Sequence, residues 1–363
     1  MSHEIAPDDI VDTLDDVAAG AREPLLVLRP LLAFLDAHDL GTGDEHPQVV
    51  PVGDGHSNVT YAVRRGGASF VLRRPPRGPL PPSAHDVLRE ARVLSALQDT
   101  QARVPRVLAV GADTAVIGAP FFVMEHVDGE VITGAVPRAL DTLAQRRRVG
   151  EELVDALVEL HAVDWAAAGL EGFGRPTGYL ERQLRRFGGL WEQHRTRPLP
   201  AVERVGAWLA DNLPRTERAT IVHGDYRLGN VMFGRRAPAQ LTAILDWEMC
   251  TIGDPLADVG YLCVMWSQTG DPSTSSSALT QVTQADGFLT REQLVARYRE
   301  RSGRSMRDVR WYSVLALWKA IVFMEGNYKR ALAGATDDPF LKACGGVVED
   351  LAERAEALTH GKG

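Results

Sequence analysis

Apolar and polar residues alternate along the first third of the chain in the manner of half-buried strands. The segments NVTYAVRR (58–65) and ASFVLRR (68–74) are joined by two consecutive glycines, and a two-residue glycine loop predicts a β-hairpin. RVLAV (106–110) and PFFVMEHV (120–127) predict two further strands. This region therefore predicts a small antiparallel sheet.

Helical spacing of apolar residues predicts two helices next to these strands. The run LLVLRPLLAFLDAH (25–38) predicts the first, and the second lies within 83–98, where Ser83 and Asp86 resemble a capping box. The apolar positions of the second helix are Val87, Ala91, Leu94 and Leu97.

Helices predominate after Gly129. The clearest is predicted over 143–163, and another within 253–266, where Asp254 and Pro255 have the form of an N-cap and a first-turn proline. The run at 313–332 predicts a helix near the C-terminus. In the first of these, four residues have core-like spacing: Leu153, Leu157, Leu160 and His161.

The pattern as a whole predicts an α+β chain in three parts. Residues 1–45 form an arm and a helix, residues 46–127 a small sheet-containing lobe with one helix, and residues 128–363 a larger, mostly helical lobe.

Composition excludes several classes of function. The chain has 40 Lys and Arg against 48 Asp and Glu, a formal net charge of -8, which argues against a nucleic acid partner. Three widely spaced cysteines and an acidic N-terminus without a signal-peptide core predict a cytoplasmic location. No apolar run reaches the length of a transmembrane span, so a membrane partner is not expected.

Two polar motifs follow short apolar runs in the helical region. HGDYRLGN (223–230) lies between TIV and VMF, and the cluster DWE (246–248) follows LTAIL. Asp, Asn and Gly are ordinary turn residues, so either motif alone predicts only a turn. Two acidic loops at the ends of adjacent strands, however, predict a functional site.

With these motifs in this order, the chain resembles the aminoglycoside phosphotransferase family of kinase-like enzymes. HGDYRLGN and DWE are similar to the family's H-G-D-x-x-x-x-N and D-W-E/D, and GDGHSNVTY, FVLRRPP, REARVLSAL and PFFVMEHVDG precede them in the family's order. These early segments are most similar to the phosphotransferase-like domain fused to some acyl-CoA dehydrogenases. The resemblance implies a two-lobed, protein-kinase-like fold.

The same resemblance implies an ATP- and Mg²⁺-dependent enzyme that phosphorylates a hydroxyl group of a small molecule. Asp225 is the candidate acceptor of the hydroxyl proton, and Asn230 and Asp246 are the candidate Mg²⁺ ligands. One carboxylate and one amide carbonyl suit Mg²⁺, which keeps waters and phosphate oxygens as its other ligands. His223 and Asp258 are expected to hold the loop in shape.

Two neighbours of Asp246 are assigned less specific roles. Trp247 is expected to pack, and Glu248 either contacts the metal or is solvated.

The nucleotide is expected to bind residues of the smaller lobe. Backbone N–H groups of the GDGHSNVTY turn would hold the phosphates. Arg73 stands where kinases usually carry a Lys that pairs with a helix glutamate, and Arg is not equivalent to Lys. Adenine would contact the backbone that follows Met124. The candidate nucleotide-binding residues are Gly53, Gly55, Ser57, Arg73, Glu90, Glu125 and Val127.

Several acceptors and one alternative without catalysis fit these residues. The resemblance to the fused domain favours a hydroxyacyl-CoA, and an aminoglycoside is the alternative. Arginines in 182–197 would meet a CoA phosphate or form a solvated face, and FMEGNYKRA (323–331) resembles an acceptor-side segment with Glu325, Asn327 and Arg330. Arg73 and the incomplete glycine loop also suit a non-catalytic, kinase-like nucleotide-binding module.

Overall fold

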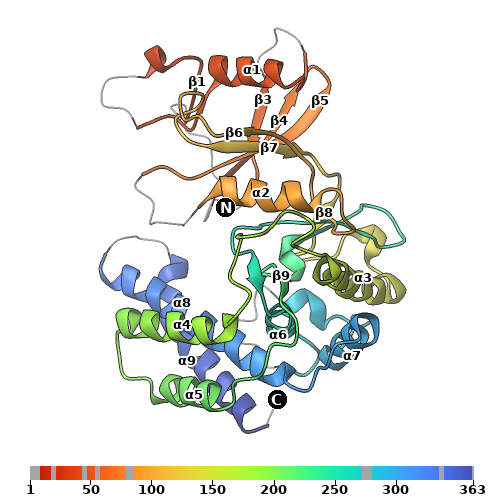
Figure 1. Cartoon of the computed structure of the whole chain (residues 1–363), viewed down its shortest axis with the longest axis vertical. Coiled ribbons are helices and arrows are strands. Elements are labelled where there is room, and N and C mark those ends of the chain that lie inside the picture. Colours follow the sequence, from red (N-terminus) through yellow and green to blue (C-terminus); the bar gives the residue numbers. More distant parts are fainter. Residues whose placement is uncertain are drawn as a thin grey trace. The chain divides into compact units, whose positions relative to one another are not determined.

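The computed structural model describes residues 9–17, 22–42, 47–53, 58–78, 85–271, 280–334 and 339–361. The chain divides into two compact units, Met1–Asp128 and Gly129–Gly363 (Figure 1). Three residues singled out in the sequence lie outside the described ranges: Gly55, Ser57 and Ser83.

A five-stranded sheet forms the frame of the first unit. Its order is β3-β4-β5-β7-β6, and every neighbouring pair is antiparallel. In the predicted hairpin, Arg65 lies opposite Ala68, and Gly66 and Gly67 have φ angles of 52° and 81°, as a type I′ turn requires. The strands are β3 (Gln48–Pro51), β4 (Val59–Arg65), β5 (Ala68–Arg74), β6 (Val107–Gly111) and β7 (Phe121–Glu125).

Helix α1 (Leu28–Ala37) packs against this sheet through Leu31 and Leu35, which share a buried cluster with Tyr61 and Phe70. The predicted helix over 25–38 was wrong at its start. Its first residues form strand β2 (Leu26–Val27), which pairs in parallel with β1 (Ile10–Val11). This pairing joins segments distant in sequence, so local periodicity does not reveal it.

Helix α2 (Val87–Leu97) contacts β6 and β7. Its N-cap is Asp86, whose side chain accepts a hydrogen bond from the Arg89 N–H at 3.0 Å. The predicted capping box had assigned the cap to Ser83, and this was wrong because the helix begins after Asp86.

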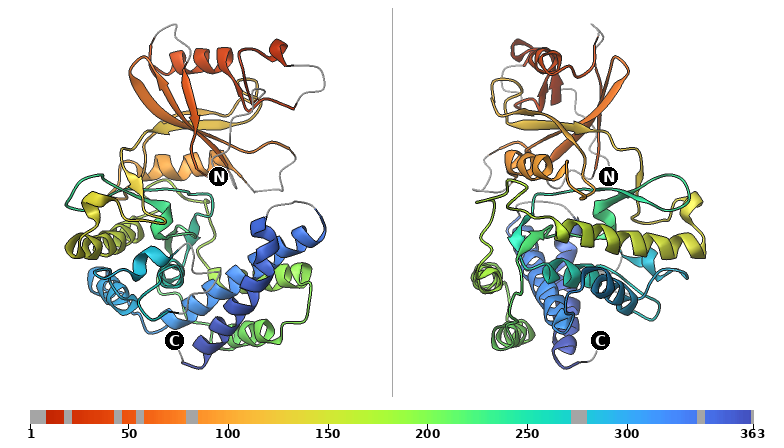
Figure 2. Two further views of the ribbon diagram at one scale, coloured as in Figure 1. Left: turned by 180° about the vertical axis from the view of Figure 1, so that it is seen from behind. Right: turned by 45° about the vertical axis from the view of Figure 1, so that its right-hand side comes forward.

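Seven long helices make up most of the second unit. Helices α8 and α9 lie side by side (Figure 2), and α6 crosses α8 so closely that a Cβ on Gly260 would lie 2.5 Å from the backbone of Tyr312. Glycine at that position therefore permits backbone contact between the two helices. The helices are α3 (Leu143–Ala162), α4 (Tyr179–His194), α5 (Pro200–Asp211), α6 (Leu256–Val264), α7 (Arg291–Ser302), α8 (Val309–Leu332) and α9 (Pro339–Thr359).

Five short strands in the second unit carry the two polar motifs. β9 (Thr220–Val222) pairs with β12 (Thr251–Gly253), while β10 (Val231–Phe233) lies between β11 (Leu241–Ile244) and β8 (Glu130–Val131). The predicted α+β class is confirmed. None of the helices in the described ranges has the length and apolarity needed to cross a membrane.

Candidate active site

The loop 223–230 joins β9 to β10, and its end is fixed to the residue before Asp246. Leu245 N–H donates to Asn230 O at 2.8 Å, continuing the ladder in which Val231 lies opposite Ile244. Because β10 begins beside the end of β11, Asn230 and Asp246 lie at the same end of these two antiparallel strands.

Asp225 and Asn230 are bonded to each other across the loop. Asn230 Nδ2 donates to the Asp225 backbone oxygen at 2.9 Å and to its Oδ2 at 2.7 Å. This orientation of the amide assigns its nitrogen to Asp225 and leaves Oδ1 as the Asn230 atom able to coordinate a cation.

The second carboxylate oxygen of Asp225 has no such partner. Oδ1 is buried and accepts no hydrogen bond from any described residue, and the nearest ionic contact is Arg227 Nε at 3.6 Å. A buried acceptor left unsatisfied costs about 1–3 kcal/mol, a cost that a bound hydroxyl group or cation would remove. The oxygen is therefore placed to accept a proton or a ligand.

Asp246 adopts a backbone conformation that is rare outside glycine. Its φ is 64°, in the left-handed region, where a residue with a Cβ is disfavoured by roughly 1–2 kcal/mol. Aspartate tolerates this region better than most residues, and such strain occurs preferentially at functional sites. The conformation turns the chain sharply as it leaves β11.

The pKa of Tyr261, on α6, is affected by both acidic residues, Asp225 and Asp246. Burial raises the pKa of its hydroxyl well above the usual value, and the Asp225 carboxylate raises it further, through its negative charge and as a hydrogen-bond acceptor for this hydroxyl. The negative charge of Asp246 has a smaller effect in the same direction. Since the charges of both carboxylates raise the pKa of the same hydroxyl, both carboxylates lie within electrostatic reach of the Tyr261 side chain.

The side-chain oxygens of Asn230 and Asp246 suit Mg²⁺ better than a metal whose ligands are all protein side chains. Among the described residues no group of three or more His, Cys, Asp or Glu side chains is placed to hold a metal. Asn230 and Asp246 would supply two hard oxygen ligands, and Mg²⁺ commonly takes its remaining ligands from phosphate and water.

His223 uses both ring nitrogens for the loop itself. Nε2 lies 2.9 Å from Leu245 O, and Nδ1 accepts the Asp225 N–H at 3.3 Å, so the neutral ring carries its proton on Nε2. The ring packs edge-on against Trp247, with centroids 4.9 Å apart. These contacts support a structural role for His223 rather than a role as a base.

Asp258, fully buried on α6, fixes the first turn of the loop. Its Oδ2 accepts hydrogen bonds from the His223 backbone N–H at 2.7 Å and from the His161 ring Nε2 at 3.1 Å, and its Oδ1 accepts one from the Gly224 N–H at 2.8 Å. Burial by itself would raise the Asp258 pKa, but these donors together lower it. Burial lowers the pKa of His161, whose Nδ1 lies 2.7 Å from Tyr298 Oη. The structure thus holds an anion at Asp258 beside a neutral His161.

Gly224 is needed where the loop passes this carboxylate. Its φ is 88°, and a Cβ would lie 2.7 Å from Met249 O. A larger residue would displace the backbone next to Asp225.

In the first unit, Arg73 and Glu90 form the expected ion pair. Arg73 Nε donates to Glu90 Oε2 at 2.9 Å, and the Glu90 side chain is only 3% exposed. Asn58 Nδ2 lies 3.4 Å from the same oxygen, and Arg73 Nη1 lies 3.4 Å from Thr60 Oγ1. The guanidinium is therefore held between β5 and α2.

The other described residues that the sequence predicts to bind nucleotide lie at or just after the ends of strands in the first unit. Gly53 follows β3 with a φ of 90°, while Glu125 ends β7, where its N–H donates to Arg106 O at 2.9 Å. Val127 lies in the irregular segment after β7.

Sequence reasoning missed two residues near Asp225, namely Tyr261 and Lys319. Burial lowers the pKa of Lys319 to about 8, while the negative charges of Asp258 and Asp225 act to raise it. Its Nζ lies 4.9 Å from the Phe187 ring centroid. The available signal was that Lys319 is the one charged residue in the apolar run 311–324.

The arginines after residue 181 do not form one common basic face. Arg182 donates to the backbone oxygens of Arg175 and Thr177, and Arg195 pairs with Glu192 at 2.9 Å. Two of the five arginines are thus engaged by residues close in sequence, and Arg197 pairs with Glu349 of α9 at 3.0 Å.

Glu325, noted in the acceptor-side segment, is fully buried and has a structural contact. Its Oε1 accepts the Thr196 N–H at 2.9 Å and the Thr196 hydroxyl at 2.7 Å. It therefore anchors the turn that follows α4.

A model of the phosphotransferase enzyme family matches residues 48–312. Mouse acyl-CoA dehydrogenase family member 10 is 33% identical over 319 residues, which cover 87% of this chain and 30% of that protein. Human acyl-CoA dehydrogenase family member 11 is 32% identical over 341 residues, covering 91% of this chain and 43% of that protein. The chain spans less than half the length of these relatives.

Solved structures show the same architecture. A proposed aminoglycoside phosphotransferase from Ralstonia eutropha superposes with a TM-score of 0.79 at 27% identity, covering 92% of this chain and 98% of that one. A mutant of aminoglycoside phosphotransferase APH(4)-Ia, in complex with AMP-PNP and hygromycin B, has a TM-score of 0.58 at 15% identity, covering 86% and 95% of the respective chains. The predicted kinase-like fold is confirmed.

Replacing Asp258 tests the buried anchor of the loop. Asp258→Asn should lower the free energy of unfolding by about 3 kcal/mol at pH 7, because the anion that accepts three N–H groups is lost. The pKa of Asp258 is lowered on folding, so its contribution is present above the usual value of 3.8 and is lost as the pH falls through the folded pKa. Urea unfolding at a series of pH values measures both effects.

The matched control is Asp211→Asn on the exposed end of α5, which should change stability by no more than about 0.5 kcal/mol. A gap between wild type and Asp258→Asn that widened toward low pH would contradict the assignment of an anion at this position.

Proposed function

The chain belongs to the phosphotransferase enzyme family, and on that premise we propose that it is an ATP- and Mg²⁺-dependent kinase of a small-molecule hydroxyl group. The observation that carries this proposal is the loop geometry around Asp225. One oxygen of its carboxylate is held by Asn230, and the other is buried without a hydrogen bond from the described residues.

Asp225 is the proton acceptor in this proposal. A substrate hydroxyl that donates to the Asp225 carboxylate would be oriented toward the terminal phosphate of ATP. Its proton would pass to Asp225 as the new P–O bond forms and as the bond from the terminal phosphorus to the bridging oxygen breaks, releasing ADP. The bond from Asn230 Nδ2 and the fixed backbone at Gly224 hold the carboxylate in one orientation, so little reorganisation is needed when substrate binds.

Asn230 and Asp246 are the proposed magnesium ligands. When bound, Mg²⁺ neutralises phosphate charge and helps to position the transferred group. The two residues themselves contribute one amide oxygen and one carboxylate from the same sheet edge, fixed by the Leu245–Asn230 backbone bond. Glu248 follows Asp246 closely and is a further candidate for this region.

The nucleotide roles proposed for the first unit rest on the Arg73–Glu90 pair, with Gly53, Glu125 and Val127 at backbone positions. Gly55 and Ser57, outside the described residues, complete the phosphate-binding turn in this proposal. An APH(4)-Ia mutant of related fold was solved with AMP-PNP, which supports an adenine nucleotide here.

A hydroxyacyl-CoA is the proposed acceptor class. The similarity to acyl-CoA dehydrogenase family members supports it, whereas the aminoglycoside alternative is supported by the complex of the APH(4)-Ia mutant with hygromycin B. We also propose a reducing, cytoplasmic setting, which the wide spacing of the three cysteines along the sequence supports. The alternative from another class is a module that binds nucleotide without catalysis.

An acceptor screen tests the substrate class. ADP release from ATP and Mg²⁺ should rise at least tenfold over the background hydrolysis with a hydroxyacyl-CoA and not with aminoglycosides, since a rise of that size corresponds to only about 1.4 kcal/mol of barrier. The matched unhydroxylated acyl-CoA is the control. Release with aminoglycosides alone would favour the alternative acceptor, and nucleotide binding without any turnover would favour the non-catalytic module.

Replacing Asp225 tests the proton acceptor. Asp225→Asn keeps the shape of the side chain and should lower kcat by roughly a thousandfold, within the range that general base catalysis contributes. Nucleotide affinity should stay within about twofold of wild type, because Asp225 is assigned to the chemical step and not to nucleotide binding. Turnover of the acceptor and an equilibrium nucleotide titration are measured on the same preparation, with Asp211→Asn as control. Undiminished turnover would remove Asp225 from this role.

Replacing Asp246 tests the metal site. Asp246→Ala should raise the Mg²⁺ concentration required for half-maximal activity by about tenfold or more, because one of two protein ligands is lost. Activity and nucleotide binding are titrated against Mg²⁺, and Asp211→Asn, at the exposed end of α5, serves as the control. Unchanged metal dependence in Asp246→Ala would argue against this ligand.

A further inference from the structure

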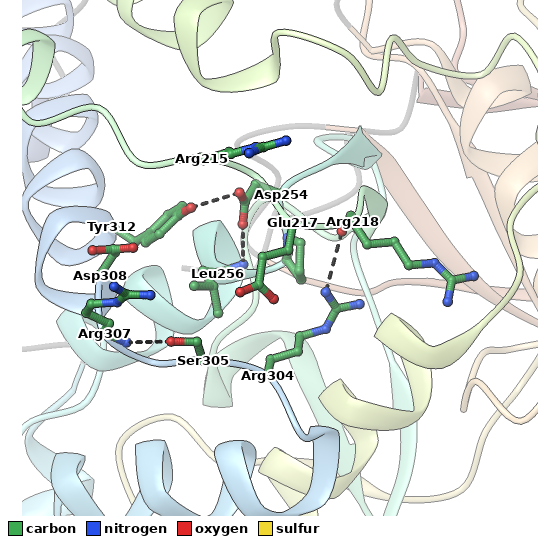
Figure 3. Close-up of a pocket in the computed structure, with 11 residues that line it drawn as sticks. Arg215, Glu217, Arg218, Asp254, Leu256, Arg304, Ser305, Arg307, Asp308 and Tyr312 are labelled. Atoms are coloured by element: carbon green, nitrogen blue, oxygen red, sulfur yellow. Dashed lines mark hydrogen bonds between the residues drawn. The ribbon is translucent and has the colours of Figure 1, made fainter.

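An arginine-lined pocket lies in the second unit, apart from the loop that carries Asp225 (Figure 3). Its volume is about 330 Å³. Two chain segments supply most of its wall, namely the segment before β9 and the turn between α7 and α8. Six of its lining residues carry the argument: Arg215, Arg218, Arg304, Arg307, Asp254 and Tyr312.

The floor of the pocket is a fixed polar pair. Tyr312 Oη donates to Asp254 Oδ2 at 2.8 Å, and Leu256 N–H donates to Asp254 Oδ1 at 3.0 Å (Figure 3). Both oxygens of this buried carboxylate are thus occupied by the protein. Asp254 therefore shapes the pocket and presents no unsatisfied acceptor to it.

The guanidinium groups of the pocket are not paired with acids. Within the described ranges, none of the four arginine side chains forms an ion pair with a carboxylate, and Arg304 Nη1 lies 3.5 Å from Arg218 O. On the neighbouring helix α7, by contrast, Arg291 pairs with Asp271 and Arg297 pairs with Asp155. The pocket thus gathers four guanidinium groups that form no ion pair with a described acid.

The net charge of the wall favours an anion. Besides the four arginines, three acids line the pocket, namely the exposed Glu217 and Asp308 and the buried Asp254, which leaves one positive charge. Guanidinium groups bind phosphate oxygens in pairs, with greater geometric specificity than ammonium groups.

The volume sets the size of the ligand. A cavity of about 330 Å³ lies at the lower end of the range for small-molecule sites, roughly 300–1,000 Å³. Glu217 and Asp308 can accept hydrogen bonds from hydroxyl groups. A sugar phosphate combines this size with both kinds of polar group.

The pocket is separate from the catalytic loop in the topology of the unit. Arg218 precedes β9, whereas His223 and Asp225 follow it, so the pocket and the loop lie at opposite ends of this strand. The two ends are nevertheless linked by α6, because Asp254 precedes the helix and Asp258 lies in its first turn.

We propose that this pocket is a second ligand site, which binds a small hydroxylated phosphate ester through Arg215, Arg218, Arg304 and Arg307. The site does not depend on the proposed kinase activity, because none of its residues is assigned to phosphoryl transfer.

Calorimetric titration with ribose 5-phosphate tests the proposal, with uncharged ribose as the matched ligand. The protein used is the whole chain of residues 1–363 with saturating AMP-PNP and Mg²⁺, so that binding at the proposed nucleotide site is blocked. Ribose 5-phosphate should bind with one site per chain, and ribose should not. Arg304→Gln and Arg307→Gln should each weaken binding by about tenfold or more, the effect of losing one charge-assisted hydrogen bond.

Arg236→Gln is the control variant, since Arg236 is an exposed arginine in the β10–β11 loop of the same unit. It should bind as wild type does. The pocket arginines lie on the surface without acidic partners among the described residues, so thermal unfolding should show all three variants folded alike. Absence of binding to wild type, or binding that Arg304→Gln and Arg307→Gln leave unchanged, would overturn the proposal even if the kinase assays succeed.

Discussion

The buried carboxylate of Asp258 is the contact on which the geometry of the catalytic loop depends. Moving an anion out of water is costly, and the cost is offset only where enough donors surround it. Two of its donors are the backbone N–H groups of His223 and Gly224, and the third is the His161 ring. The charge therefore fixes the backbone on the N-terminal side of Asp225, where no regular ladder does so.

Helix α6 carries this constraint to the rest of the second unit. Asp254 before the helix is bonded to Tyr312, Asp258 holds the loop, and Tyr261 lies within electrostatic reach of Asp225. The close contact at Gly260 seats the helix on α8. A displacement of α6 would thus move the anchor of the loop and the surroundings of its central carboxylate together, since both belong to one rigid element.

Local sequence signals predicted the elements that local chemistry determines. The Gly66-Gly67 hairpin follows from turn geometry, and the helix at 143–163 follows from periodicity; both lie where predicted. The strand at Leu26–Val27 was mistaken for helix because its partner is β1, a non-local pairing. The N-cap of α2 was wrongly assigned to Ser83 because the sequence offers two polar residues for this position, Ser83 and Asp86.

The residues of the site fall into the same two groups, those that local sequence motifs reveal and those that only the fold brings together. The residues of HGDYRLGN and DWE stand out because several polar residue types recur at fixed spacing. Tyr261 and Lys319 do not, since each lies on an apolar helix and meets Asp225 only in the folded unit. The arginine pocket is still less visible in the sequence, because its members come from separate segments and each alone reads as an ordinary surface charge.

Arg73 shows how a departure from the kinase pattern can preserve the chemistry. A lysine has one nitrogen, which must serve both the helix glutamate and the phosphates. Arg73 contacts Glu90 through Nε, and its two Nη nitrogens lie further along the same rigid plane. The contact between Nε and Glu90 helps to fix the plane of the guanidinium group, and Nη1 lies 3.4 Å from Thr60 Oγ1. An arginine at this position can keep both contacts, provided that the phosphates lie farther from the strand than a lysine would require.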